Sequence, residues 1–366
     1  MTPDAAAKTA SAPRTAYDAR QALDAHLREV IRWHFSPETG APIWLDWAKR
    51  SGVDPIARVK SVEDLLLFPN FADESLRNEP LERWIPAAYR GRPFTVFETG
   101  GTTGMPKQRI GWDDYKIDYE QFSATLSDAD FPRNGYWLMM GPTGPRRLRL
   151  AIEHLANFRG CSCFFVDLDP RWVKKLISGK QIDQAKAYME HVVDQAVTIL
   201  THRRVDALFT TPKLLEALAE KISIPDAGIK GVFCGGTTME PQYTRFLIEE
   251  VLEGKTKFVP TYGNTLMGLA CHKPLTPEDR YSITYYAPQP RAMLRVVDPE
   301  RPERLVEYDQ WGRVELTTLT KEFFMPRFLE RDEAIRRRSC ALYPWDGVGE
   351  VRPFGASKTT IVEGVY

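Results

Sequence analysis

The chain has 366 residues, of which 43% are hydrophobic and 27% are charged. This is the composition of a globular protein with one large or two ordinary domains, and it excludes a disordered chain or a fibre. Lysine plus arginine and aspartate plus glutamate both number 49. Because these charges balance, the chain lacks the positive field that draws proteins to nucleic acid or anionic membranes, and we expect neither as a partner.

The number and spacing of the cysteines and the N-terminal residues indicate the cellular compartment. The five cysteines show no repeated spacing, so they describe neither a disulfide framework nor a zinc site. Residues 1–15 are rich in small and polar residues and lack the apolar core of a signal peptide, and no apolar run approaches membrane-spanning length. We therefore expect a cytoplasmic protein whose residues 1–15 form a disordered tail.

Residues 16–93 are predicted to form a helical N-terminal region. Apolar residues recur at helical spacing over residues 17–35, where Asp24 can pair with Arg28 one turn later. Ser61, followed three residues later by Asp64, has the pattern of a helix N-cap.

Residues 94–273 alternate between β-prone and helical patterns. The β-prone runs are residues 94–98, 136–140, 163–166, 207–210, 231–234 and 257–260, and helical periodicity covers residues 147–158, 181–202, 213–221 and 240–252. This alternation predicts an α/β core with a mainly parallel sheet covered by helices. In such sheets the ligand lies beyond the carboxyl ends of the strands.

The sequence pattern changes after residue 273. Extended patterns over residues 281–286, 293–297, 305–308 and 314–319 predict a smaller antiparallel β lobe spanning residues 274–340.

The strongest motif follows the first β-prone run and reads Glu98-Thr-Gly-Gly-Thr-Thr-Gly-Met-Pro-Lys107. Glycine permits positive φ angles and close backbone approach, so this loop can turn N–H groups and hydroxyls toward phosphate oxygens, with Lys107 as a point charge. It is not the P-loop of NTPases, because Pro106 precedes the lysine and Gln108 follows it. A glycine-rich loop alone is more often a simple turn.

The run from Thr99 to Lys107 closely resembles the phosphate-binding signature of the adenylate-forming superfamily of acyl- and aryl-CoA ligases, nonribosomal adenylation domains and luciferases. The resemblance implies the large N-terminal α/β lobe of that fold, ATP and AMP as ligands, and a reaction that joins a carboxylate to the α-phosphate of ATP and releases pyrophosphate. Lys107 is then expected to be catalytic. The nucleotide-binding residues of the loop are expected to be Thr99, Gly100, Gly101, Thr102, Thr103 and Gly104.

Three further segments resemble the family in the family's order. Phe233-Cys-Gly-Gly-Thr237 resembles the strand end that lines adenine, which implies nucleotide contacts for Gly235, Gly236 and Thr237. Thr261-Tyr-Gly-Asn-Thr265 resembles the Tyr-Gly-x-Thr-Glu motif, which implies roles for Tyr262, Gly263 and Asn264 at the nucleotide and for Thr265 as a catalytic residue at the α-phosphate. Pro326-Arg-Phe-Leu-Glu-Arg-Asp332 resembles the segment whose aspartate binds both ribose hydroxyls, as one carboxylate can.

Within the superfamily the resemblance is greatest to phenylacetate-CoA ligases, through Gly52-Val-Asp-Pro, Ser61-Val-Glu-Asp-Leu and Leu316-Thr-Thr-Leu-Thr-Lys-Glu. The chain also resembles short adenylating-type proteins of phenazine antibiotic (griseoluteic acid) biosynthesis. These resemblances imply a small aromatic carboxylate as substrate and an acyl pocket near Gly141, His154 and Cys234. For His154 a packed helix residue is the alternative.

Two departures from the family affect the expected activity. Leu266 stands where the family has a magnesium-binding glutamate, so Mg²⁺ is expected to accompany ATP with an incomplete protein site. Residues 341–366 resemble the family's hinge, so the C-terminal subdomain and its catalytic lysine are predicted to be absent, and activity to be weak or lost. Lys358 does not occupy the motif of that lysine.

Other chemistry-bearing residues have simpler explanations. Asp167 and Asp169 fit a polar strand-end turn better than a site. Cys161 and Cys163 lack metal-ligand spacing and fit core positions. Cys271-His272 fits an interior pair better than a reactive thiol.

We therefore expect ATP-dependent activation of an aromatic acid as an acyl adenylate, with the acyl group passed to a separate acceptor or reductase protein. One alternative is acyl transfer to a cysteine, Cys340 or Cys271, as in acyl-protein synthetases. The other is a catalytically silent module that binds nucleotide or carboxylate. The sequence leaves the oligomeric state open, with a homodimer as one option.

Overall fold

A computed structural model of the chain describes residues 15–99, 105–145, 147–236 and 238–355. Residues 1–14 of the expected tail lie outside this range. Thr15 is the N-cap of the first helix, where its hydroxyl accepts a hydrogen bond from the Asp18 N–H at 3.0 Å. Among the described residues, no helix combines the length and the apolar character needed to cross a membrane.

The N-terminal region is helical, as predicted. Ser61 and Asp64 form a capping box, although the helix that they begin is a 3-10 helix. The region consists of α1 (Ala16–Phe35), α2 (Pro42–Ser51), α3 (Pro55–Arg58), η1 (Val62–Leu67), α4 (Ser75–Asn78), η2 (Leu81–Trp84) and η3 (Ala87–Tyr89).

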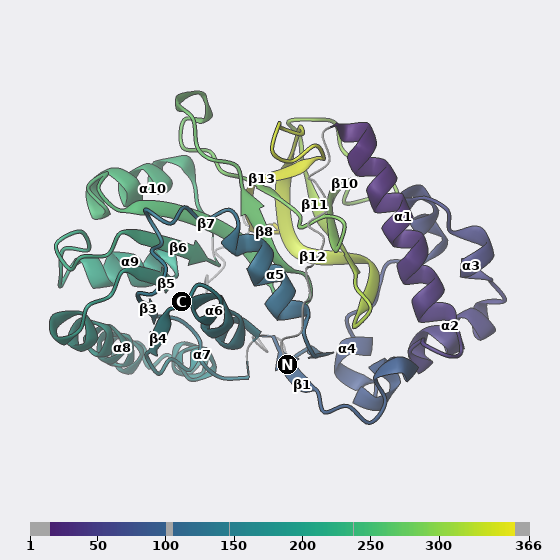
Figure 1. The fold of residues 1–366 in the computed structure, drawn as a ribbon, viewed down its shortest axis with the longest axis horizontal. Helices are drawn as coiled ribbons and strands as arrows, with labels where there is room; N and C mark the ends of the chain where they lie inside the picture. The colour runs from purple at the N-terminus through teal and green to yellow at the C-terminus, as the bar shows by residue number, and fades with distance from the viewer. Residues whose placement is uncertain (1–14, 100–104, 146, 237, 356–366) are drawn as a thin grey trace, which may run out of the picture.

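This helical region packs on the antiparallel end of the sheet (Figure 1). The rings of Phe35, Trp44 and Phe68 all lie within 6.1 Å of the ring of Phe324, measured between centroids. Phe324 is fully buried. This aromatic cluster fixes residues 16–93 against the strand that carries the candidate site.

Within the described residues, eleven strands form one continuous sheet in the order β10-β11-β12-β13-β9-β8-β7-β6-β5-β3-β4. Five strands pair in parallel at one end: β4 (Ser162–Phe165), β3 (Tyr136–Met139), β5 (Ala207–Thr210), β6 (Gly231–Gly235) and β7 (Lys257–Asn264). The other strands pair antiparallel: β8 (Gly268–His272), β9 (Thr284–Tyr286), β13 (Gly347–Pro353), β12 (Phe324–Arg337), β11 (Trp311–Leu319) and β10 (Ala292–Val297). The predicted parallel core and antiparallel lobe are both present, joined edge to edge through β7 and β8.

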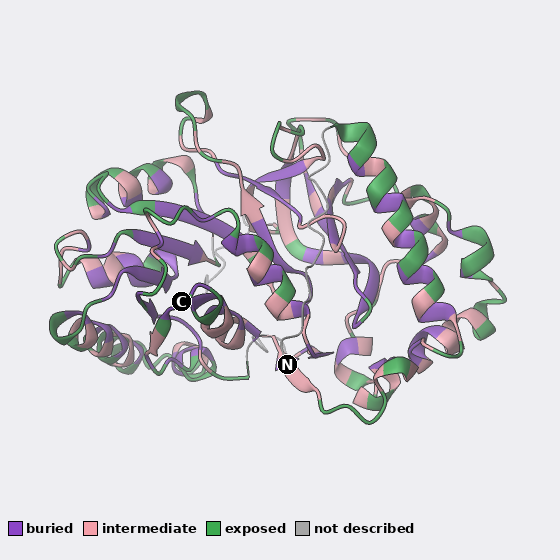
Figure 2. Ribbon diagram, in the orientation of Figure 1, coloured by how far each residue is buried: buried purple, intermediate pink, exposed green. Residues whose placement is uncertain are grey.

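Helices cover both faces of the parallel strands, and Figure 2 shows burial concentrated on the strands and on the helix faces turned toward them. These helices are α5 (Asp114–Ser123), α6 (Arg147–Phe158), α7 (Pro170–Ser178), α8 (Ile182–His202), α9 (Pro212–Ala219) and α10 (Pro241–Phe246), the last continued by a π-helical turn, η4 (Leu247–Val251). One face packs against α5 and α6 and the other against α8, α9 and η4.

Two predicted strands differ from the structure. Residues 95–98 form β1 (Thr95–Glu98), which pairs only with β2 (Gln108–Gly111) in a separate antiparallel hairpin, so this run is not part of the parallel sheet. The predicted strand over residues 305–308 is not a strand in the structure: Leu305 makes an isolated bridge with Val297, and Tyr308 lies in a turn. The region resembling a hinge includes β13, which lies between β12 and β9 in the sheet.

Candidate functional site

Four polar residues meet where the end of β7 faces the middle of β12. The Tyr262 hydroxyl donates a hydrogen bond to Asp332 Oδ2 at 2.7 Å, and Asn264 Nδ2 donates to Glu330 Oε1 at 2.6 Å. In the sheet order β8, β9 and β13 lie between these strands. The sheet therefore curves enough to bring side chains of β7 and β12 into direct contact.

Both carboxyl groups of this cluster have perturbed acidity. Burial raises the pKa of Asp332 from its usual value, against the opposing effects of the Tyr262 hydrogen bond and the Lys107 charge. Burial, helped by the charge of Asp332, raises the pKa of Glu330 to about 7. At neutral pH the pair therefore carries less negative charge than two exposed carboxylates.

Lys107 reaches the same place from the β1–β2 hairpin. Its Nζ lies 4.6 Å from the centroid of the Phe328 ring and 3.7 Å from Asp73 Oδ2. Burial lowers the pKa of Lys107, while the charges of Glu330 and Asp73 raise it. The predicted catalytic lysine thus lies beside the predicted ribose-binding carboxylate.

The base of the glycine- and threonine-rich loop is closed by backbone pairing. The Thr99 N–H donates to the Lys107 carbonyl at 3.0 Å, and the Lys107 N–H donates to Thr99 Oγ1 at 3.1 Å. The predicted nucleotide-binding residues Gly100, Gly101, Thr102, Thr103 and Gly104 lie outside the described residues, as does Thr237.

Asn264 also holds the tight turn after β7. Its Oδ1 accepts hydrogen bonds from the N–H groups of Leu266 at 2.9 Å and Met267 at 2.8 Å. A Cβ at Gly263 would lie 2.4 Å from the Gly268 carbonyl oxygen, so only glycine permits this approach of β7 to β8. Thr265, the second predicted catalytic residue, is half-buried in this turn.

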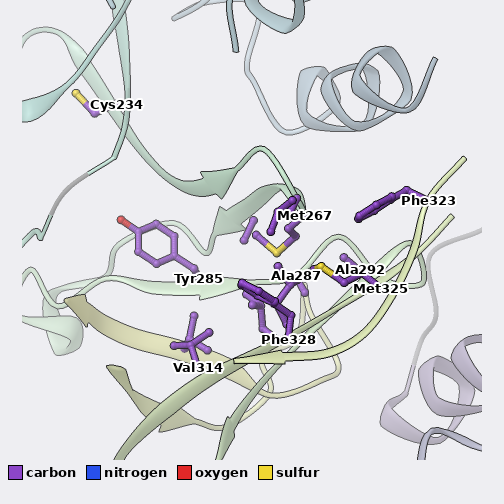
Figure 3. Packing of buried hydrophobic residues seen from close by; sticks show 14 of the residues in the cluster. Cys234, Met267, Tyr285, Ala287, Ala292, Val314, Phe323, Met325 and Phe328 are labelled. Carbon is purple, nitrogen blue, oxygen red and sulfur yellow. The ribbon is translucent and has the colours of Figure 1, made fainter. Parts of the chain in front are cut away.

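The turn places the Leu266 side chain in the apolar interior. Leu266 and Met267 belong to the apolar cluster that also contains Ala287, Met325 and Phe328 (Figure 3). Within the described part of the chain, no three His, Cys, Asp or Glu side chains are grouped to hold a metal ion. These residues therefore do not fit a protein-held Mg²⁺ at this turn.

A buried network of ion pairs lies against this turn. The network was not predicted from the sequence. Arg109 on β2 donates to the Thr265 carbonyl at 3.3 Å and to Asp114 Oδ2 at 2.7 Å. Arg291 bridges Asp114 and Asp118 at 2.8 Å each. Burial, the largest effect, lowers the pKa of Arg109 to about 10. The network connects the β1–β2 hairpin, α5 and the turn after β7. It therefore holds the site residues in position but is not itself part of the site.

Glycines at the ends of β3 and β6 lie close to the ring of Phe209. A Cβ at Gly141 would lie 2.9 Å from the Phe209 ring, and one at Gly235 would lie 3.4 Å from the same ring. Gly236 follows with φ +101°, a conformation that glycine adopts without strain. Gly141 and Gly235 thus both adjoin Phe209, which packs on the face covered by α6.

The structure separates two of the residues expected in the acyl pocket. His154 lies on α6, where its Nε2 is 2.8 Å from Glu120 Oε1. Cys234 points to the opposite face of the sheet, into the cluster with α9, because side chains alternate along β6 and its neighbour Phe233 takes the α6 face. Gly141 and His154 share one face, and Cys234 does not.

Among the weaker candidates, Asp169, Cys161 and Cys163 lie at structural positions. Asp169 caps α7 by accepting from the Arg171 N–H at 2.8 Å. Cys161 is buried and Cys163 lies on β4. Burial raises the pKa of the Cys271 thiol to about 12, which keeps it protonated at neutral pH, and lowers that of His272 to about 4, which keeps its imidazole neutral.

Glu330 belongs to the site but was not predicted from the sequence. It precedes Asp332 by two positions on β12, at an irregularity of the strand where Leu329 pairs with Glu315 and Glu333 pairs with Arg313. No strand was predicted over these residues, so their spacing carried no signal.

Comparisons with known proteins bear on the fold. No protein-family model and no curated protein matches the sequence. Among solved structures, the chain is similar to 2-hydroxyisobutyryl-CoA ligase in an open conformation in complex with 2-HIB-AMP and CoA, with a TM-score of 0.66 and 18% identity over 92% of this chain and 74% of that one. With the postadenylation state of the same ligase, in complex with R3-HIB-AMP, the TM-score is 0.67 and the identity 17%, over 92% and 68% of the two chains. The chain therefore has the α/β fold of 2-hydroxyisobutyryl-CoA ligase.

Proposed function

We propose that this protein binds ATP and a carboxylic acid and joins them as an acyl adenylate with release of pyrophosphate. The observation that carries the proposal is the convergence of Tyr262, Asn264, Asp332 and Lys107 at one end of β7 and the facing part of β12. These residues come from three segments that are distant in sequence, and each is one that the family resemblance assigns to the nucleotide.

The reaction needs positioning more than covalent help from the protein. A carboxylate oxygen attacks the α-phosphorus, a new oxygen–phosphorus bond forms, and the bond to the pyrophosphate oxygen breaks. Asp332 accepts hydrogen bonds from the ribose hydroxyls, and the Tyr262 ring lies against adenine. Lys107 and Thr265 stabilise charge at the phosphates.

The finer assignment rests on the resemblance to phenylacetate-CoA ligases. We propose an aromatic acid as substrate, in phenazine-type secondary metabolism, with Gly141 and His154 beside the acyl group. We propose that the acyl group then passes to a separate protein. Acyl transfer to Cys271 is disfavoured by its raised pKa, which leaves Cys340 for that alternative. The apolar residue Leu266, in place of the family's glutamate, favours the alternative of a silent binding module.

Replacing Asp332 with alanine tests the nucleotide assignment. Loss of its hydrogen bonds to ribose is expected to weaken ATP binding by roughly ten- to a hundredfold, or about 1.5 to 3 kcal/mol. Isothermal titration calorimetry measures the change. Asp346→Ala is the matched control, since Asp346 accepts a similar tyrosine hydrogen bond, from Tyr308 at 2.9 Å, away from the site.

Two results would contradict this assignment. One is equal binding of ATP by the wild type and Asp332→Ala. The other is equal affinity of the wild type for ATP and 2′,3′-dideoxy-ATP, which lacks the hydroxyl donors.

A further inference from the structure

Arg147, the first residue of α6, is a buried arginine with unused hydrogen-bond donors. Its side chain is 4% exposed, and its Nη2 donates to Asp118 on α5. Within the described residues, neither its Nε nor its Nη1 has a hydrogen-bond partner. These two nitrogen atoms carry three N–H groups, and donors that are buried without a partner reduce stability.

The unpartnered Nη1 distinguishes Arg147 from two other fully buried arginines. Arg109 and Arg159 each leave only Nε without a partner in the described part of the chain. Both terminal nitrogen atoms of Arg109 donate, to Leu266 and Asp114, and both of Arg159 donate, to Ser123 and Asp128. A buried group that stays unpaired in this way needs an explanation, and a ligand that accepts the hydrogen bonds is one.

The Nη1 atom of Arg147 lies against the turn between β7 and β8. A Cβ at Gly268 would lie 2.8 Å from it, so the glycine leaves room for the guanidinium beside the backbone. Tyr262 packs with the apolar cluster on the other face of the sheet, and α6 covers the face of Arg147. The proposed adenine residue and Arg147 therefore flank the turn from opposite faces, and Arg147 is placed for the acid and not for the nucleotide.

The residues proposed to lie beside the acyl group share the face of Arg147. Gly141 adjoins this face, and His154 follows Arg147 on α6 after about two turns. Both α6 side chains reach α5, Arg147 at Asp118 and His154 at Glu120. The positive end of the α6 dipole adds to the preference for an electron-rich group here.

We infer that Arg147 determines which acid is bound, by donating hydrogen bonds to an oxygen or ring nitrogen that the acid carries apart from its reacting carboxylate. The inference rests on the proposed function and narrows its substrate to acids with such an acceptor. Asp118 already supplies a negative charge to the guanidinium, so a neutral acceptor is sufficient. A site built in this way discriminates against an analogue without the acceptor, because the donors then stay buried and unpaired.

The test uses pairs of acids that differ only in the acceptor: 4-acetylbenzoate with 4-isopropylbenzoate, and phenazine-1-carboxylate with anthracene-1-carboxylate. Calorimetry measures their affinities for the protein saturated with α,β-methylene-ATP, which cannot release pyrophosphate. The wild type is expected to bind the acceptor-bearing acid of at least one pair about tenfold more tightly. Arg147→Met, which has no donor, is expected to lose this preference. Arg147→Lys keeps the charge beside Asp118 without the planar set of donors and is expected to lose most of it.

Arg149→Met is the matched control, with circular dichroism to check the folding of all variants. Arg149 lies in the same first turn of α6 but pairs with Glu153 at 3.3 Å, so its loss removes one positive charge there and should leave the preference unchanged. Equal wild-type affinities within both pairs, or a preference that survives in folded Arg147→Met or Arg147→Lys, would overturn the inference and leave the proposed function intact. A wild type that binds no nucleotide analogue, or none of the four acids, would instead overturn the proposed function itself.

Discussion

At the scale of single residues, the site is defined by carboxyl groups that are buried beside one another. Glu330 and Asp332 lie two positions apart on β12, and each is held by one neutral donor from β7. Desolvation favours the protonated form of both. Perturbed groups of this kind mark functional sites more often than ordinary packing, because burial of charge reduces stability.

Glu330→Gln tests this burial through the pH dependence of stability. The folded carboxyl has a pKa of about 7 against an ordinary value of 4.5. Between these pH values the unfolded chain loses the proton while the folded chain keeps it, so the wild type becomes less stable as pH rises. Glutamine does not titrate and keeps the acceptor for Asn264. The variant is expected to gain up to about 3 kcal/mol relative to the wild type between pH 5 and pH 8.

Urea denaturation at the two pH values measures the difference. The exposed Glu303→Gln is the control and should show no such change. A stability gap between Glu330→Gln and the wild type that is the same at pH 5 and pH 8 would show that Glu330 ionises normally.

At the scale of elements, the turn between β7 and β8 holds the site in position. Gly263 and Gly268 bring the two strands together, Asn264 accepts two N–H groups within the turn, and Arg109 binds the Thr265 carbonyl from below. The turn is therefore fixed from both sides, and Tyr262 keeps its orientation toward Asp332.

Gly268→Ala tests the role of this turn. Gly268 has φ +105°, and a Cβ there would lie 2.5 Å from Asp118 Oδ2 in the ionic network. Gly228 also has positive φ, +83°, but no atom lies within 4 Å of its Cβ position. Gly228→Ala is therefore expected to lower the free energy of unfolding only by the backbone strain, about 1 to 2 kcal/mol, and to leave the ATP affinity unchanged.

Gly268→Ala should lower the free energy of unfolding by about 1 to 3 kcal/mol more than Gly228→Ala does, because of the clash with Asp118. It should also weaken ATP binding. Denaturation and calorimetry on both variants give the comparison. Equal losses of stability, with equal ATP affinities, would show that the turn does not need close packing on Asp118.

The sequence predicts some elements well for a physical reason. The strands β3, β5 and β6 are buried on both faces, so continuous apolar runs identify them. The same signal cannot distinguish β1, whose apolar run pairs in a hairpin. β12 was not predicted; the structure pairs it with β11 on one edge and with β13 on the other, and its register toward β11 is irregular between Leu329 and Glu333.

The site was predictable only in part. Tyr262 and Asp332 were identified through motifs that the resemblance supplied. Arg109 was not, because its partners Asp114 and Thr265 are brought to it by the fold and no local pattern connects them. The fold similarly sends Cys234 away from His154, since a strand alternates its side chains.

At the scale of the whole molecule, the site lies at the junction of three regions. The helical N-terminal region brings Asp73 beside Lys107 of the β1–β2 hairpin, and the curved sheet brings Tyr262 and Asp332. The aromatic cluster around Phe324 fixes the first of these regions to the strand β12. The candidate site is therefore a product of the assembled fold and not of one motif.

The most direct test of acyl adenylate formation follows a carboxylate oxygen. The protein is incubated with ATP, Mg²⁺, hydroxylamine and aryl acids labelled with ¹⁸O in the carboxylate, and the products are analysed by mass spectrometry. Attack on the α-phosphorus followed by cleavage at the acyl carbon leaves one labelled oxygen on AMP and releases pyrophosphate. We predict labelled AMP and an aryl hydroxamate. Unlabelled AMP, formation of ADP, or ATP binding without turnover of any acid would contradict the account.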